Sequence, residues 1–185
     1  NKIDHIYLYD YLKELLESGR IKVDKSVNAG KVFTWHDSCK HGRELERNFG
    51  RGYFEEPRWI IQQCVDQFVD MEPNRMNNYC CGAGGGNWPM PYEAESAYHG
   101  RFKYKQIKDS GANVVVVGCS NCHDQMMKRL PKYYTDYKYE VKYIWELVAD
   151  SLVIDPWTDE EIAQAEAEAK AQWERLGVEI EEDEE

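Results

Sequence analysis

The order of apolar and polar positions along this chain predicts helices separated by short strands. Near the start, four leucines recur at helical spacing and form one apolar stripe: Leu8, Leu12, Leu15 and Leu16. The stripe predicts a helix over residues 4–18, with Asp4 as its N-cap and Gly19 at its end. The same reasoning predicts helices over 57–68, 93–109, 121–130 and 144–153, strands over 31–35, 76–79, 113–117 and 139–143, and a loop over 42–56.

The strand order points to an α/β fold with a mostly parallel sheet and flanking helices. Its strongest element is the run Val114–Val117, which is typical of a strand covered on both faces. Ligands bind such sheets at the carboxyl ends of the strands. Three expected strands are each followed by cysteine, so we expect five thiols to converge at one rim of the sheet: Cys39, Cys80, Cys81, Cys119 and Cys122.

Composition and charge narrow the class of protein. Of 185 residues, 42% are hydrophobic and 31% are charged, which is a globular profile. The net charge is −11, but residues 158–185 contain 12 acidic and 2 basic residues and account for −10 of it. The remaining body therefore carries no basic excess, which argues against a nucleic-acid footprint and against docking on an anionic membrane. No apolar run approaches the ~20 residues needed to cross a bilayer.

The charge distribution predicts a body over residues 1–157 and an acidic helical tail over residues 158–185. Thr158 and Glu161 form a capping box, an alanine-rich helix continues to Arg175, and Gly177 could end it. We expect the tail to be solvated; the alternative is an arm that clasps a partner subunit. Because the chain begins with Asn1 and lacks a signal-peptide pattern, we expect it to be the C-terminal part of a longer polypeptide.

The cysteine pattern indicates a metal site or a redox centre in a reducing compartment. The chain is too large to need a disulfide framework, and its cysteines include a vicinal pair and a CxxC. Thiolates are soft donors that suit iron–sulfur clusters or zinc. Thiol–disulfide exchange at Cys119 and Cys122 is a further alternative, but it leaves three cysteines unexplained. The glycine loop Gly82–Gly86 has neither the dinucleotide-binding nor the P-loop spacing.

We expect the sixth cysteine and three nearby histidines to have roles other than metal ligation. Cys64 lies on an apolar helix face, so core packing is expected and it is excluded from the site. His36, His41 and His123 flank the clustered cysteines. Hydrogen bonding to the ligand sulfurs or proton delivery is one interpretation for them, with His36 and His123 the stronger candidates; loop histidines without a role are the other.

Three segments resemble the cysteine-rich CCG domain of the heterodisulfide reductase catalytic subunit family: Trp35–Cys39, Cys80–Gly86 and Gly118–Cys122. The resemblance runs from about His5 to Leu152 and is strongest to C-terminal domains of related iron–sulfur subunits in membrane-associated redox complexes of sulfate reducers. It implies a [4Fe-4S] cluster, non-cubane in the best-understood members, with five ligands: Cys39, Cys80, Cys81, Cys119 and Cys122. The vicinal pair can bind two neighbouring irons, and Gly82 and Gly84 let backbone N–H groups approach the cluster sulfides.

The resemblance implies an electron-transfer oxidoreductase of anaerobic respiration. It would exchange electrons with a thiol or disulfide substrate, and a small carrier protein is one form that this substrate could take. Partner subunits would hold iron–sulfur clusters or hemes, the location would be cytoplasmic, and any membrane contact would be indirect. The heterodisulfide reductase subunit has two such motifs and this chain has one, so substrate and mechanism stay open. The alternatives are a docking module with structural zinc or a redox-idle cluster, and a pure electron relay.

Overall fold

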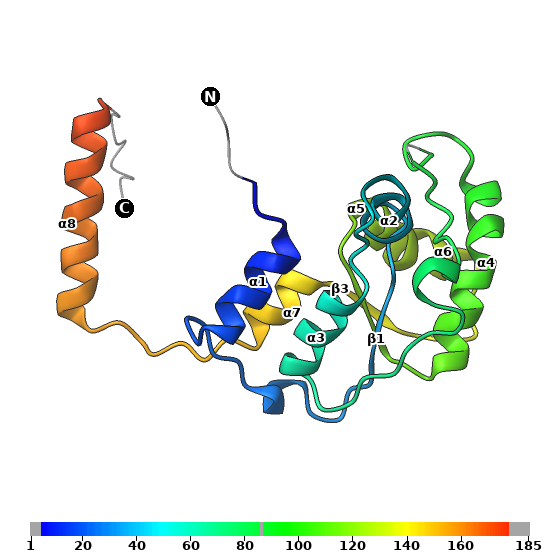
Figure 1. Cartoon of the computed structure of the whole chain (residues 1–185), viewed down its shortest axis with the longest axis horizontal. Coiled ribbons are helices and arrows are strands. Elements are labelled where there is room, and N and C mark those ends of the chain that lie inside the picture. Colours follow the sequence, from blue (N-terminus) through cyan, green and yellow to red (C-terminus); the bar gives the residue numbers. More distant parts are fainter. Residues whose placement is uncertain (1–4, 86, 178–185) are drawn as a thin grey trace. The chain divides into compact units, whose positions relative to one another are not determined.

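The computed structural model describes residues 5–85 and 87–177. It divides into two compact units, one ending at Val153 and the other beginning at Ile154 (Figure 1). The first unit contains the sheet and all the cysteines. The second unit contains one helix and is described by itself below.

A three-stranded parallel sheet lies at the centre of the first unit. The strands are β1 (Phe33–Trp35), β2 (Val114–Val117) and β3 (Glu140–Tyr143), in the order β1-β2-β3. In the register, Phe33 lies opposite Val114, which in turn lies opposite Glu140. All four residues of β2 are buried, as its valine run predicts. The expected α/β class with a parallel sheet is confirmed.

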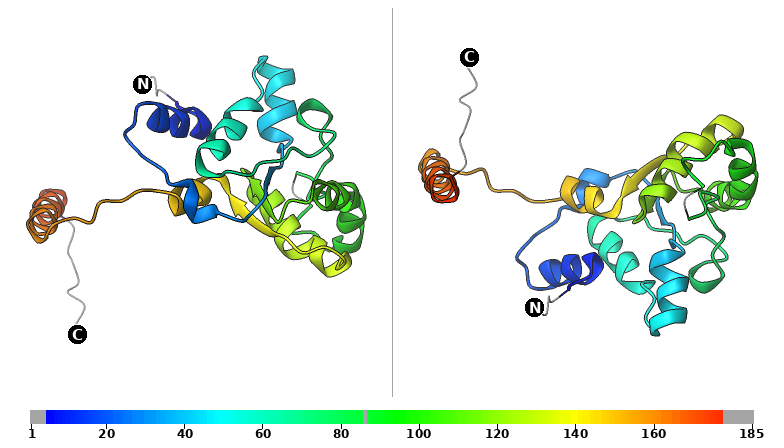
Figure 2. Two further views of the ribbon diagram at one scale, coloured as in Figure 1. Left: turned by 90° about the horizontal axis from the view of Figure 1, so that it is seen from below. Right: turned by 90° about the horizontal axis from the view of Figure 1, so that it is seen from above.

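Helices cover both faces of the sheet, and the pleat of β2 explains how. Val114 and Val116 face a core that includes residues of α1 (Leu8–Glu17), α3 (Glu55–Cys64) and α7 (Ile144–Asp150). Val115 and Val117 face a second core built with α4 (Glu93–Ser110), α5 (Ser120–Asp124) and α6 (Leu130–Tyr133). Figure 2 shows the blue and teal helices on one side of the sheet and the green helices on the other. Successive side chains of a strand point to opposite faces, so one apolar run supplies both cores.

Several predicted elements are confirmed with small shifts at their ends. The first helix begins at Leu8 with Tyr7 as its N-cap, and the expected cap Asp4 lies outside the described residues. Helix α4 ends at Gly111, whose positive φ of 70° forms a left-handed C-cap. The helix expected over 121–130 is α5 followed by a π-helical turn, Gln125–Arg129, and α6.

Two predictions about the cysteine-bearing loops are wrong. Residues 42–56 are not a loop, because a π-helical turn (Lys40–Glu44), α2 (Leu45–Phe49) and the start of α3 lie there. Residues 76–79 form no strand; the first two of them belong to a 3₁₀ turn, Arg75–Asn77, and the Asn78 side chain binds the carbonyl of Asp37 where a sheet ladder was expected. In both places tertiary contacts overrode local propensity.

The helix expected from Pro57 to Phe68 is also shorter than predicted. It begins at Glu55, two residues before Pro57, and ends at Cys64, with Val65 already extended. Phe68 instead forms an isolated parallel bridge with Phe33 at the free edge of β1. Phe68 is therefore apolar because it covers the edge of the sheet and not because it belongs to the helix. Helical periodicity alone cannot distinguish these two cases.

The second unit contains α8 (Asp159–Leu176). The Thr158 side chain accepts from the backbone N–H of Glu161 and the Glu161 carboxylate accepts from the N–H of Thr158, which confirms the predicted capping box. Gly177 has a positive φ of 66° and ends the helix as expected. The acidic run 181–185 lies outside the described residues. Among the described helices, none combines the length and apolarity that a membrane span requires.

Candidate metal centre

Two cysteine loops begin where adjacent parallel strands end. The backbone N–H of His36 donates to the carbonyl of Val116 at 3.0 Å, so the β1–β2 ladder extends into the loop that leads to Cys39. Strand β2 is followed by Gly118 and then Cys119, the N-cap residue of α5. Because parallel strands present their carboxyl ends at one rim, these two loops start side by side.

The third cysteine loop arrives without a strand and is held by Asn78. The Asn78 side-chain N–H donates to the carbonyl of Asp37, and its side-chain oxygen accepts from the Lys103 ammonium. The Asn78 carbonyl accepts from the Arg43 guanidinium at 2.6 Å. Asn78, which lies two residues before Cys80, thus connects three parts of the fold. These are the loop after β1, the π-helical turn after Cys39 and helix α4. Because both the oxygen and the nitrogen of this buried side chain have partners, it can fix the loop.

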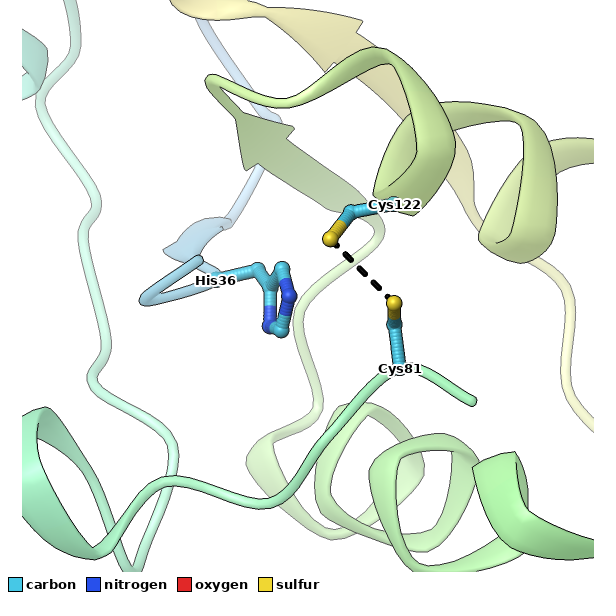
Figure 3. A group of neighbouring side chains, drawn as sticks. All are labelled: His36, Cys81 and Cys122. Atoms are coloured by element: carbon cyan, nitrogen blue, oxygen red, sulfur yellow. Dashed lines mark hydrogen bonds between the residues drawn. The ribbon is translucent and has the colours of Figure 1, made fainter. Parts of the chain in front are cut away.

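Two of the five candidate sulfurs are in contact in the buried part of the site. The Sγ atoms of Cys81 and Cys122 are 3.2 Å apart and share a hydrogen bond. One ring nitrogen of His36 lies within 4.8 Å of both, and the three side chains point toward one another from two loops and from helix α5 (Figure 3). His36, Cys81 and Cys122 are 1%, 3% and 4% exposed. Cys39 and Cys119 are half-buried and Cys80 is exposed, so the five thiols run from the core to the surface.

The thiols polarise one another. A hydrogen bond from the Cys122 thiol lowers the pKa of Cys119 to about 6 against the effect of burial, and backbone N–H groups of α5 assist. Hydrogen bonds with Cys122 and Cys80 hold the pKa of Cys81 well below its usual range. The same contacts raise the pKa of Cys80 and Cys122, which keep their protons. The site therefore favours thiolates at Cys81 and Cys119, and the thiolate is the form that binds metal ions.

These residues fit a group that soft sulfur donors hold. Side chains from three separate segments meet at one place: the thiols of Cys81 and Cys122 are in contact, and the adjacent His36 ring has no hydrogen-bond partner on either nitrogen among the described residues. In the metal-bound site, the sulfurs that now contact each other would instead bind to metal ions between them. The donor chemistry suits an iron–sulfur cluster or zinc.

Comparison with known proteins identifies the family of this chain. Residues 33–127 match the cysteine-rich domain family named CCG. The chain belongs to the CCG cysteine-rich domain family. The resemblance noted from the three cysteine segments is therefore confirmed.

Three relatives of this CCG chain are named as oxidoreductases or as subunits of them. It is 37% identical over 83 residues, 44% of the chain, to the Hdr-like menaquinol oxidoreductase iron-sulfur subunit 2 of Archaeoglobus fulgidus. It is 31% identical over 149 residues, 80% of the chain, to one subunit of the dihydromethanophenazine:CoB–CoM heterodisulfide reductase of Methanosarcina acetivorans. A third relative, 31% identical over 60% of the chain, is the EtfAB:quinone oxidoreductase of Syntrophomonas wolfei. The matches span 14%, 34% and 14% of these relatives' lengths, so the CCG chain corresponds to a minor part of each.

The sixth cysteine of the CCG chain lies in the core. Cys64 is fully buried on α3 among residues that cover one face of the sheet. Burial raises the pKa of its thiol to about 11. It behaves as a small apolar side chain, as the sequence predicts.

We expect Cys64 to resist alkylation in the folded protein. At pH 8 its thiol is protonated and out of reach of solvent, whereas thiolates are the reactive form. Mass spectrometry after iodoacetamide treatment should find Cys64 unmodified in native, metal-free protein and modified after unfolding in guanidinium. Modification of native Cys64 as fast as Cys119 would contradict its burial.

The structure separates the three flanking histidines. His36 faces the buried sulfurs, and burial followed by the positive charge of Lys103 lowers the pKa of its ring. His41 instead shares a hydrogen bond of 2.8 Å with the Tyr9 hydroxyl. His123 stacks on Tyr143 with ring centroids 4.2 Å apart. A role toward the sulfurs stays a prediction for His36 and His123, and the placement favours His36.

Gly82 is required by packing. Its φ of +94° is a left-handed conformation, and a Cβ at this position would lie 2.3 Å from the carbonyl oxygen of Ser96 and 2.7 Å from the backbone nitrogen of Gly100. The loop therefore lies directly on the backbone of α4. The Gly82 N–H also donates to the Cys80 sulfur at 3.3 Å. Gly84 has a φ of +42° and more space around it, and its expected approach to a cluster stays a prediction.

We expect Gly82→Ala to destabilise the protein by about 2–4 kcal/mol, because it adds a backbone clash to the strain of a positive φ. Gly19→Ala is the matched control, since Gly19 has a φ of +70° but no atom within 4 Å of the added Cβ. It should cost only about 1 kcal/mol, the conformational penalty alone. Urea unfolding measures both changes. Equal effects would show that the contact with α4 is not needed.

Sequence reasoning missed the polar support of the site. Asn78, Asp37, Arg58 and Lys103 are all buried beneath the cysteine loops. One signal was available: Lys103 lies at helical spacing from Gly100 and Ile107, on the face of α4 that is otherwise buried. A charged residue on that face indicates a buried partner.

Proposed function

We propose that this chain is an iron–sulfur oxidoreductase domain that transfers electrons to or from a sulfur substrate of the thiol or disulfide type. The cluster would be of the [4Fe-4S] type, in cubane or non-cubane form, held by Cys39, Cys80, Cys81, Cys119 and Cys122. The observation that carries the proposal is the buried contact between Cys81 and Cys122, with His36 from the loop that leads to Cys39 beside it. The relatives named as iron–sulfur and heterodisulfide reductase subunits support it.

The number and placement of the thiols favour a cluster over a single zinc ion. Structural zinc sites use four ligands in a tetrahedron, whereas the three segments of this domain carry five cysteines. The adjacent residues Cys80 and Cys81 differ in burial, one exposed and one buried, while their thiols share a hydrogen bond. Such a pair serves two neighbouring metal ions better than one ion.

The chain's own residues divide the site into a closed side and an open side. A bound cluster supplies one-electron chemistry. Cys81, Cys122 and His36 close the inner side against water, because each is almost fully buried. Cys80 is exposed at the outer side, where a sulfur substrate could approach. Lower dielectric on the closed side strengthens every charge interaction made there.

Reducing one disulfide to two thiols consumes two electrons and two protons. A single cluster passes one electron at a time, so we propose that partner subunits with iron–sulfur clusters or hemes supply the second redox site. We also propose a cytoplasmic location, with membrane contact only through those partners and with a small carrier protein as one form of the substrate.

Iron and acid-labile sulfide analysis of anaerobically reconstituted protein tests the proposal. About four irons and four sulfides per chain, as a [4Fe-4S] cluster requires, are expected. The electron paramagnetic resonance signal should change when a thiol or disulfide is added. Stoichiometric zinc without sulfide would replace this proposal with a structural docking module. A full cluster whose signal ignores every sulfur ligand would indicate an electron relay.

A further inference from the structure

We propose that Lys103 is the buried counter-charge of the cysteine site and takes up a proton when that site gains an electron. The inference rests on the proposed cluster, and it adds a residue that is not among the ligands. Lys103 is a positioning residue in this scheme, since its charge acts through space on the sulfurs.

The placement of Lys103 is unusual for a lysine. Its side chain lies on α4, is 0% exposed and ends beneath the cysteine loops. The ammonium donates to the side-chain oxygen of Asn78, and the sulfur of Met71 lies 4.0 Å away. No carboxylate lies within 4.0 Å of it among the described residues. Burying an ammonium group without an anion is costly, so a fold that retains one indicates a negative charge nearby.

The Asp37 carboxylate attracts Lys103, but cations already neutralise most of its charge. Asp37 accepts two hydrogen bonds from Arg58, at 2.7 and 2.9 Å, and further bonds from the Trp35 indole and the Arg75 backbone. Arg58 is shared with Asp70 on its other side. Besides Asp37, the anionic groups that act on Lys103 are the sulfurs of Cys81, Cys122 and Cys80.

The charges around Lys103 come from every element packed on it. His36 and Asp37 follow β1, Cys80 and Cys81 lie in the third loop, Cys122 lies on α5, and Arg58 lies behind Asp37. Burial lowers the pKa of Lys103 to about 7, while attraction to Asp37 and to the sulfurs of Cys81, Cys122 and Cys80 opposes that effect. The amine is therefore poised to change its charge near neutral pH.

The charges of these groups determine how the uptake of an electron and the uptake of a proton are coupled. An electron from the donor adds one negative charge to the site, and that charge favours the ammonium form of Lys103. A proton from solvent then binds Nζ, so one electron and one proton enter together and the net charge of the buried region is unchanged. At low pH the ammonium is present throughout and raises the reduction potential. At high pH the amine is neutral and the potential is lower.

Redox titration of the reconstituted chain at several pH values tests the proposal, with Lys103→Met as the variant. The wild-type potential should fall as pH rises through 7, with a slope of up to 59 mV per pH unit for one proton per electron, which is one tenfold step. Lys103→Met should lack this slope. Its reduction equilibrium should be at least tenfold less favourable at pH 6, and it should approach the wild type at pH 9.

Lys105→Met is the matched control, because Lys105 lies on the same helix, is exposed and pairs with Asp109. Its potential and slope should equal those of the wild type. A wild-type slope that persists in Lys103→Met would assign the proton to another group, such as His36, and overturn the inference. A potential that is independent of pH in the wild type would do the same.

The metal-free protein separates this inference from the proposed function. If the wild type binds no iron, the proposed function fails, but thiolate absorbance near 240 nm still reports on Lys103. Below pH 7 its charge should favour thiolates, so the absorbance should appear at higher pH in Lys103→Met. An unchanged thiolate titration would overturn the counter-charge. If Lys103→Met does not fold, Lys103→Gln retains a donor for Asn78 and is read by the same criteria.

Discussion

Replacing Cys81 with serine should remove most of the iron from the reconstituted protein. Cys81 is the buried thiol that contacts Cys122 at 3.2 Å, and its lowered pKa favours the thiolate form. A serine hydroxyl stays protonated at neutral pH and is a harder, weaker ligand for iron. We expect iron to fall from about four atoms per chain to below one, measured together with sulfide after anaerobic reconstitution.

Cys64→Ala provides the matched control for this loss. Both thiols are buried, but Cys64 lies on α3 in the core and not among the cysteine loops. The control should retain the full iron and sulfide content, with stability lowered only by the small cavity. Far-ultraviolet circular dichroism confirms that each metal-free variant is folded. Wild-type iron in Cys81→Ser, or equal losses in both variants, would contradict the assignment of Cys81 to the site.

Arg58→Met should destabilise the protein by about 3–5 kcal/mol, because it leaves a buried carboxylate without its partner. Arg58 is 4% exposed and Asp37 is 3% exposed. Burial alone would raise the pKa of Asp37, but the hydrogen bonds and charge of Arg58 outweigh it and lower that pKa. Asp37 belongs to the loop that carries Cys39, so the pair also holds that loop. Urea unfolding at pH 7 measures the loss.

The effect of Asp37 on the pH dependence of stability should have opposite signs in the wild type and in Arg58→Met. In the wild type the folded pKa of Asp37 is depressed, so its contribution is present above the unfolded value, near 3.8, and is lost as pH falls through the folded pKa. In Arg58→Met the unpaired buried carboxyl has a raised pKa, so acidification should recover part of the stability. Urea unfolding between pH 3 and 7 distinguishes the two slopes.

An exposed ion pair supplies the comparison for Arg58. Lys31 and Glu140 are 3.0 Å apart, with side chains 40% and 58% exposed. Lys31→Met should change stability by less than about 1 kcal/mol, because solvent screens this pair. A similar small effect for Arg58→Met would mean that water reaches Asp37 and relieves its charge.

The local sequence was sufficient for the elements that carry their own signals. The run Val114–Val117 specifies a buried strand because β-branched residues suit a covered sheet and no helical spacing competes. The end of α4 at Gly111 and the capping box of α8 were predictable because capping chemistry is local. The predictions for the segments after Cys39 and before Cys80 were wrong, because residues distant in sequence determine the backbone there.

Sequence by itself determined which residues carry the chemistry of this CCG chain and where two of its cysteine loops leave the sheet. Thiol identity, the vicinal pair and the CxxC spacing are properties of the chain, and a parallel sheet brings its strand ends to one rim. Only the tertiary structure decided that the third loop is held by Asn78, that Asp37 is neutralised by Arg58 and that Lys103 lies beneath the sulfurs. The physical reason is that burial and charge pairing depend on neighbours brought together by folding, and a linear pattern does not record those neighbours.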